Sequence, residues 1–113
     1  MKARNPVRKK AGQKHLTSKA IISRLHANND ALKAFSVRKI GLFGSYAAGR
    51  QTQKSDLDFV VEFDEPTFDH YMGLIDFLEK LFGKKVDVLT PEGVESIRIK
   101  SVADDIRRNT VYA

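Results

Sequence analysis

The sequence contains no cysteine, and this absence excludes two kinds of site. Without thiols the chain can form neither a disulfide framework nor a thiolate metal centre, and its composition gives no sign of an oxidising compartment. Long apolar runs are also missing. Nothing approaches the roughly 18 apolar residues of a membrane span, and the N-terminus lacks the apolar stretch of a signal peptide. We therefore expect a soluble cytoplasmic protein with no membrane contact.

Acidic residues are absent from the first 14 positions, which hold six of the 20 lysines and arginines. The net charge of +6 comes from this segment, because basic and acidic residues balance over the remainder of the chain. We interpret residues 1–15 as a solvated, disordered tail, and the alternative is a tail that contacts RNA, DNA or an acidic partner. Its cations are Lys2, Arg4, Arg8, Lys9, Lys10 and Lys14.

The length of 113 residues has room for one compact core and none for a second domain of ordinary size. We assign residues 16–113 to this domain. Its pattern predicts the order helix, strand, loop, strand, helix, strand, helix. A small mixed β-sheet flanked by helices, an α/β (α+β) fold, would bury the apolar faces of these elements.

The first half of the domain reads as one helix and two strands. Thr17 or Ser18 caps the helix, and a short apolar strand over 38–43 leads into a glycine-bearing loop that runs through residue 55. The strand over 56–63 shows the clearest alternation, with four apolar side chains on one side. The apolar residues of the helix are Ile21, Ile22, Leu25, Leu32 and Phe35, and those of the strand are Leu57, Phe59, Val61 and Phe63.

The second half reads as helix, strand and helix. An amphipathic helix over 71–82 ends at Gly83, and a short strand follows over 86–89. Thr90, with proline in the next position, caps a last helix. Its apolar positions are Val94, Ile97, Val102 and Ile106. Four aromatic residues are interpreted as core or interface residues in preference to a base-stacking platform: Phe68, Tyr71, Phe77 and Phe82.

Two aspartates share one face of the strand over 56–63. Asp56 and Asp58 are two residues apart, so their side chains project the same way, about 6.6 to 6.8 Å apart along the strand. Asp87 lies between two valines of the next strand and points away from the face that those valines bury. Burying unpaired carboxylates is costly, whereas Mg²⁺ accepts carboxylates together with phosphate oxygens. The three aspartates therefore predict a divalent metal site.

Gly44 and Ser45 end the first strand. A residue without a side chain lets the backbone approach a phosphate, and a hydroxyl can donate a hydrogen bond to it. The eight-residue pattern that ends in Gly-Lys-Ser or Gly-Lys-Thr is missing, which disfavours a P-loop ATPase or kinase. Singly, this glycine and serine would be interpreted as turn or cap residues.

Together these residues resemble a known signature. Gly44-Ser45, ten intervening residues, Asp56-Leu57-Asp58 and a separate strand with Asp87 are similar to the motif of the polymerase-beta-like nucleotidyltransferases. The similarity is closest to the minimal nucleotidyltransferases of prokaryotes and extends from about residue 40 to the C-terminus. The resemblance implies the polymerase-beta-like nucleotidyltransferase fold. It also implies transfer of a nucleotide from a nucleoside triphosphate, which is expected to be ATP.

The resemblance also implies roles for individual residues. Asp56, Asp58 and Asp87 would ligate two Mg²⁺ ions, and Asp87 would help to activate the acceptor hydroxyl. Many relatives have an arginine where this chain has Ala48 and Gly49. The nucleotide would be held by Gly44, Ser45 and Ser55, with Arg50 or Lys54 in the place of that arginine.

Family members of this size are commonly paired with a HEPN-domain protein in toxin–antitoxin modules. The leading hypothesis is therefore transfer of AMP to a hydroxyl, a tyrosine, of a HEPN ribonuclease toxin, which silences it. The alternative is a binding-only antitoxin that masks the toxin sterically with a vestigial site. A third hypothesis is a nucleotidyltransferase that acts on RNA ends and uses the basic tail as its nucleic-acid contact.

Deleting residues 1–14 tests the division into tail and domain. We expect the truncated chain to keep its melting temperature and its nucleotide chemistry, because we expect no residue of the tail to pack in the core of the domain. Circular dichroism and a transfer assay with labelled nucleotide measure the two properties. Loss of transfer in the truncated chain would show that the tail belongs to the functional unit.

Overall fold

Four strands form a single mixed sheet in the computed structural model, which describes residues 16–96 and 100–113. The strand order is β3-β2-β1-β4. The pair β2–β3 is parallel, whereas β1 pairs antiparallel with both β2 and β4. The predicted mixed sheet is therefore confirmed, with one additional strand. The bounds are Val37–Phe43 for β1, Leu57–Phe63 for β2, Val86–Leu89 for β3 and Val111–Tyr112 for β4.

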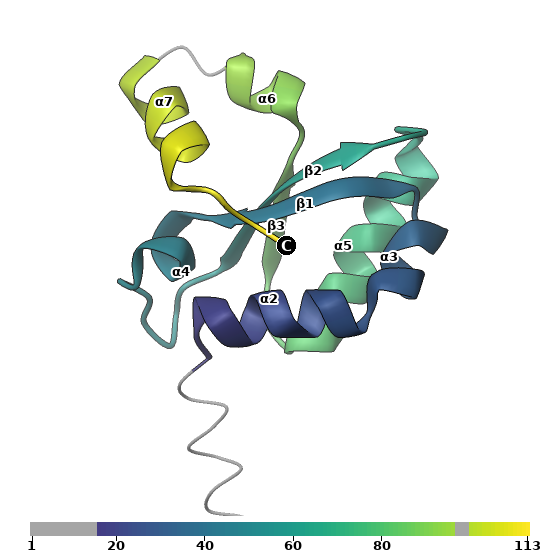
Figure 1. Ribbon diagram of the computed structural model, residues 1–113, viewed down its shortest axis with the longest axis horizontal. Coiled ribbons are helices and arrows are strands. Elements are labelled where there is room, and N and C mark those ends of the chain that lie inside the picture. Colours follow the sequence, from purple (N-terminus) through teal and green to yellow (C-terminus); the bar gives the residue numbers. More distant parts are fainter. Residues whose placement is uncertain (1–15, 97–99) are drawn as a thin grey trace, which may run out of the picture.

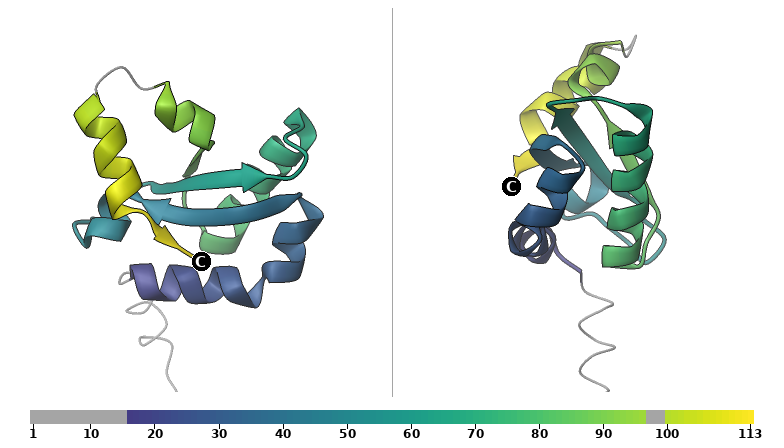
Figure 2. Two further views of the ribbon diagram at one scale, coloured as in Figure 1. Left: turned by 45° about the horizontal axis from the view of Figure 1, so that its top comes forward. Right: turned by 90° about the vertical axis from the view of Figure 1, so that its right-hand side faces the viewer.

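Helices cover both faces of the sheet. Three helices, α2, α3 and α5, pack on one face, and α6 and α7 lie over the other, as Figures 1 and 2 show. The short α4 follows β1 at one end of the sheet and contacts β1, β2 and α7. The bounds are Ser18–Ala27 for α2, Asn29–Ala34 for α3, Gly44–Ala48 for α4, Phe68–Phe82 for α5, Pro91–Glu95 for α6 and Lys100–Asn109 for α7.

The larger core lies between the sheet and helices α2, α3 and α5. The predicted apolar face of β2 is its centre, with Leu57, Phe59 and Val61 wholly buried and Phe63 nearly so. The opposite face has a smaller core in which Val60 packs with Val94 and Ala103 from α6 and α7. The strand that carries the aspartates is therefore covered on both sides along part of its length.

The first predicted helix is two helices in the structure. Asn28 interrupts it, because both its backbone N–H and its side-chain amide donate to the carbonyl of Arg24, at 3.1 and 2.8 Å, and close the end of α2. Thr17 is the N-cap, and its hydroxyl accepts a hydrogen bond from the N–H of Ala20. The expected single helix over this region is thus wrong. Of its five predicted apolar residues, three are buried, and Ile22 and Phe35 are partly buried against the core.

The loop expected over 44–55 also differs, because its first five residues form α4. Gly49, in a left-handed conformation, ends that helix. The predicted helix after Thr90 is divided into α6 and α7, and Ile97 of that prediction lies outside the described residues. The predicted tail over residues 1–15 lies outside them as well.

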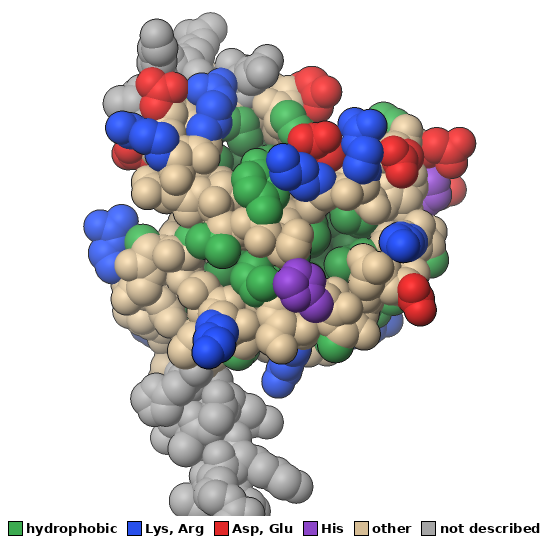
Figure 3. All heavy atoms as spheres, in the orientation of Figure 1, with side chains coloured by type: hydrophobic (Ala, Val, Ile, Leu, Met, Phe, Trp, Pro, Cys, Tyr) green, Lys and Arg blue, Asp and Glu red, His purple; other side chains and the backbone are tan. Residues whose placement is uncertain are grey.

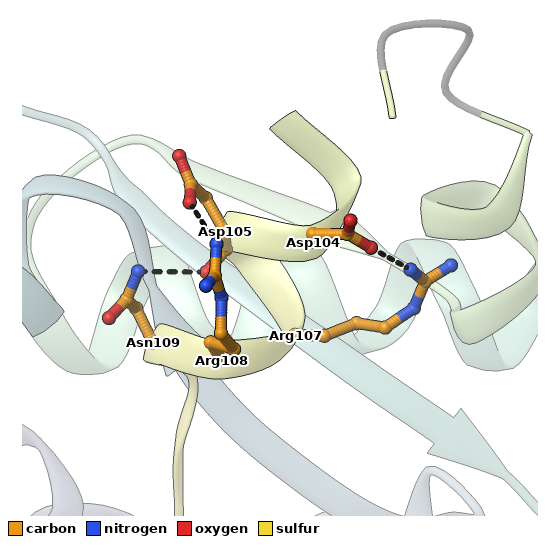
Figure 4. Close-up of polar contacts among 5 residues, drawn as sticks. All are labelled: Asp104, Asp105, Arg107, Arg108 and Asn109. Carbon is orange, nitrogen blue, oxygen red and sulfur yellow. Dashed lines mark hydrogen bonds and ion pairs between the residues drawn. The ribbon is translucent and has the colours of Figure 1, made fainter. Parts of the chain in front are cut away.

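The exposed side of α7 carries ion pairs within the helix itself. Arg107 contacts Asp104 at 2.9 Å and Arg108 contacts Asp105 at 3.0 Å, and Asn109 donates to the backbone carbonyl of Asp105 (Figure 4). Such exposed pairs contribute little to stability, so we interpret this side as a solvated helix face. In the part of the chain that the structure describes, no helix is long and apolar enough to cross a membrane.

Candidate active site

The strand register brings two of the three predicted aspartates side by side. In the parallel pair β2–β3, Asp58 lies opposite Asp87, and in the antiparallel pair β1–β2 it lies opposite Phe43. Asp58 therefore lies on the central strand of three, with Asp87 of β3 on one side and the end of β1 on the other. Asp56 immediately precedes β2, on the same face as Asp58. Asp56 and Asp87 are exposed, and Asp58 is half-buried.

The electrostatic environment of Asp58 disfavours its charged form. The pKa of Asp58 is raised from 3.8 to about 6, first by burial, then by the charges of Asp87 and Asp56, and last by a hydrogen bond with Asp87. The carboxylates of Asp87 and Asp56 are thus close enough to repel that of Asp58. A bound cation would remove this repulsion, which is the electrostatic behaviour expected at a divalent metal site.

Gly44 makes direct contact with the same carboxylate. It has a φ of +77°, and a Cβ atom placed on it would lie 2.3 Å from Oδ2 of Asp58. Only glycine satisfies both the left-handed backbone and this close approach. The two halves of the predicted signature, Gly44-Ser45 and the aspartate pair, therefore meet in space. Ser45 is half-buried in the first turn of α4.

The loop between α4 and β2 is folded by its own hydrogen bonds. The N–H of Arg50 donates to the carbonyl of Ser45 at 2.9 Å, and the N–H of Thr52 donates to the hydroxyl of Ser55 at 2.8 Å. Ser55, predicted to bind nucleotide, thus has a structural role in this loop. Arg50 and Lys54 are exposed on it. The described contacts do not join either cation to the aspartates.

Two residues that sequence reasoning missed anchor this loop to the body of the domain. Lys84 donates from Nζ to the carbonyl of Gln53 at 3.0 Å, and the side-chain amide of Gln51 donates to the carbonyl of Leu16 at 3.1 Å. Both contacts join segments that are more than 30 positions apart in sequence. Local periodicity carries no signal for such contacts.

A pocket of about 470 Å³ opens beside the carboxylates. Asp58 and Asp87 line it together with Phe43, Tyr71 and Ile75. Tyr71, interpreted from the sequence as a core or interface residue, is half-buried and donates its hydroxyl hydrogen bond to the carbonyl of Val88 at 2.7 Å. It therefore joins the core of the domain to the wall of this pocket.

The metal site itself stays a prediction. Over residues 16–96 and 100–113, no group of three or more His, Cys, Asp or Glu side chains is arranged to hold a metal ion. Asp58 and Asp87 are neighbours, so a shared ion needs reorientation of side chains and not of strands. Asp56 and Asp87 are exposed and have the freedom to turn.

The fold and the glycine–aspartate contact agree with the comparison to known families. Residues 27–113 match the model of the nucleotidyltransferase domain, and this chain belongs to that family. It is accordingly a nucleotidyltransferase enzyme by family.

Two curated relatives are similar over most of the domain. The protein adenylyltransferase MntA of Thermococcus cleftensis is 36% identical over 99 residues, which is 86% of this chain and 96% of the relative. MJ1379 of Methanocaldococcus jannaschii, named as a candidate protein adenylyltransferase, is 46% identical over 76 residues, which is 64% of this chain and 76% of the relative.

Solved structures share the fold. A structure described as a candidate minimal nucleotidyltransferase superposes with a TM-score of 0.68 at 26% identity, over 86% of this chain and 96% of that one. A toxin–antitoxin complex with AMP-PNP superposes with a TM-score of 0.56 at 22% identity, over 86% of this chain and 72% of that one. The minimal nucleotidyltransferase fold expected from the sequence is confirmed.

Gly44→Ala tests the contact between the glycine and Asp58, and Gly49→Ala is its matched control. Both glycines have a positive φ, +77° and +73°, but the space around Gly49 is open. Each alanine should lose about 1–2 kcal/mol of unfolding free energy through its backbone conformation. Gly44→Ala should lose about 1–3 kcal/mol more through overpacking, together with nucleotide binding. Denaturant titration and calorimetry with Mg²⁺–ATP measure both, and equal losses would contradict the contact.

Asp58→Asn tests the cost of ionising Asp58, which comes from burial and from its like-charged neighbours, through the pH dependence of stability. The folded-state pKa of Asp58 lies above its ordinary value, so its ionised form opposes folding, and this cost falls as pH decreases through about 6 toward 3.8. In metal-free protein at pH 7.5, the asparagine should add about 1 kcal/mol to the unfolding free energy, after allowance for solvent screening. That gain should shrink at pH 4.5. Denaturant titrations with a chelator at both pH values measure it, and an equal gain would be the contrary result.

Proposed function

We propose that this chain is a protein adenylyltransferase. It transfers AMP from ATP, with Mg²⁺, to a hydroxyl of a partner protein, a tyrosine of a HEPN-type ribonuclease toxin, and so acts as an antitoxin. The observation that carries the proposal is the contact of Gly44 with Asp58, because it joins the expected phosphate-binding turn to the expected metal-binding carboxylates. The relatives named protein adenylyltransferase support the choice of a protein acceptor.

The residues present fit a divalent cation. Burial and the neighbouring carboxylates of Asp87 and Asp56 raise the pKa of Asp58, and carboxylate oxygen is the ligand that Mg²⁺ prefers. In the proposed site Asp56 and Asp58 hold two Mg²⁺ ions with the triphosphate, and Asp87 completes the ligand set. The metal would neutralise charge on the phosphates during an in-line displacement.

The transfer exchanges one phosphorus–oxygen bond for another. The acceptor oxygen attacks the α-phosphorus, the bond from that phosphorus to the bridging oxygen breaks, and pyrophosphate leaves. The hydroxyl proton passes to a carboxylate. We assign this role to Asp87, which lies beside Asp58. Gly44, Ser45 and Ser55 position the triphosphate, while Arg50 and Lys54 supply positive charge from the loop.

We place the acceptor hydroxyl on another protein. The similarity in fold to an antitoxin-containing complex solved with AMP-PNP supports a toxin as that partner. ATP is a cytoplasmic substrate, and we place the reaction in the cytoplasm. The basic tail is not assigned a part in it.

A second candidate is a binding-only antitoxin. In that case the fold masks the toxin sterically, and the aspartates are vestigial.

Transfer of label distinguishes the two candidates. The full chain is mixed with α-labelled ATP, Mg²⁺ and the product of its neighbouring gene, which we expect to be the HEPN-type partner. The double variant Asp56→Ala, Asp58→Ala is tested in parallel. We expect label and an added mass of one or more AMP groups on a tyrosine of the partner, and at least a hundredfold less with the double variant. Other labelled nucleoside triphosphates in the same assay give the base preference.

Two further outcomes decide against the proposal. An unlabelled partner that forms a stable complex with both versions, and is neutralised by both, would replace it with the binding-only antitoxin. Label that remains with the double variant would remove Asp56 and Asp58 from the proposed metal site.

A further inference from the structure

Strand β3 is an edge of the sheet, and it carries one of the site carboxylates. It pairs with β2 on one side only, so its other side has no strand partner within the described residues. This free side begins beside Asp87 and runs along the pocket that Asp58 and Asp87 line. An unpaired strand edge is a template for pairing with another extended chain.

The parallel register shows which backbone groups face outward. The N–H of Leu57 donates to the carbonyl of Lys85 at 3.0 Å, and Leu57 lies opposite Val86. In a parallel ladder the same strand residue bonds to those on either side of its partner, so the bonds to β2 come from residues 85, 87 and 89. The N–H and carbonyl groups of Val86 and Val88 therefore point away from β2.

Helix α5 caps two of these four outward groups. Glu79 accepts the N–H of Val86 through Oε2 at 3.1 Å, and the Tyr71 hydroxyl donates to the carbonyl of Val88 at 2.7 Å. The two capping residues are eight positions apart on α5, with Ile75 midway between them. The carbonyl of Val86 and the N–H of Val88 remain, and no described contact pairs them.

An acceptor and a donor two residues apart on a strand edge match one residue of an extended peptide. That residue donates its N–H to the Val86 carbonyl and accepts from the Val88 N–H through its own carbonyl. The pocket over Ile75 gives the incoming chain space. Both outer groups of the edge are already satisfied by α5, so the docking position is limited to this single register.

We propose that an extended segment of the acceptor protein docks on the free edge of β3, between the Glu79 and Tyr71 caps, and there presents its hydroxyl. This inference rests on the proposed function, because it names how the protein acceptor reaches the site. A residue of the docked strand that lies beside Asp87 has its side chain on the same face of the sheet as Asp87 and Asp58. The edge therefore directs an acceptor side chain toward the carboxylates.

Val88→Pro removes the docking N–H and leaves the sheet intact. Proline is compatible with an edge strand where its N–H faces outward, so the bonds between β2 and β3 are kept. Val88→Ala is the matched control, since it shortens the buried side chain and retains the N–H. We expect Val88→Pro to raise KM for the HEPN-type partner at least tenfold, with affinity for Mg²⁺–ATP within twofold of the unaltered chain. Val88→Ala should leave both values within about twofold.

A second pair of variants covers the case in which proline impairs folding. Ile75→Arg places a long charged side chain from α5 in the pocket beside the free edge. Met72→Arg introduces the same side chain at an exposed position on that helix outside the pocket. We expect only Ile75→Arg to raise the partner KM tenfold. Equal KM values for the unaltered chain and a folded Val88→Pro, or equal effects of the two arginines, would overturn the docking site.

Amide exchange separates failure of this inference from failure of the proposed function. In the complex with the partner, exchange of the Val88 N–H should slow at least tenfold relative to the free chain, whether or not label is transferred. Protection without label would retain the docking edge and refute adenylylation. Label without protection would retain adenylylation and refute the docking edge. Absence of both label and complex would refute the docking edge and adenylylation together.

Discussion

The position of Asp58 between β1 and β3 is the constraint on which the site depends. Its carboxylate lies against Gly44 at the end of β1 and opposite Asp87 on β3, so a single side chain touches the two other parts of the site. Backbone pairing, and not side-chain flexibility, fixes these neighbours. A slip of one residue between β2 and either neighbouring strand would turn its side chains to the other face and separate the parts.

This arrangement concentrates negative charge where the fold gains least from it. The carboxylates lie on the face that α6 and α7 only partly cover, while the wholly buried side chains of β2 lie on the other face. Burial of apolar side chains in the larger core supplies the stability that offsets like-charge repulsion at the site. Such a division is common at functional sites, where charge placed for chemistry opposes folding.

Much of this fold could be predicted from the sequence, because alternation marks β2 and helical periodicity marks α5. The placement of the glycine-bearing turn and the aspartates in one site followed from a known motif, whereas the contact of Gly44 with Asp58 came from the structure. The break at Asn28 could not be predicted, since it depends on a competing side-chain hydrogen bond, and β4 has only two residues. The anchors Lys84 and Gln51 act on backbone groups more than 30 positions away, for which spacing gives no indication. Whether the aspartates bind metal remains a prediction.

The connection between the two parallel strands has a consequence for synthesis of the chain. Antiparallel β1 and β2 are joined by residues 44–56, which include α4, but β3 can reach β2 only after α5 has crossed over and packed on the sheet. The aspartate pair on β2 therefore exists before its third member arrives. Long-range parallel pairing is slow to form. The three carboxylates therefore come together only after α5 has crossed over and β3 has paired with β2. A chain stalled before that step would carry the motif without the assembled site.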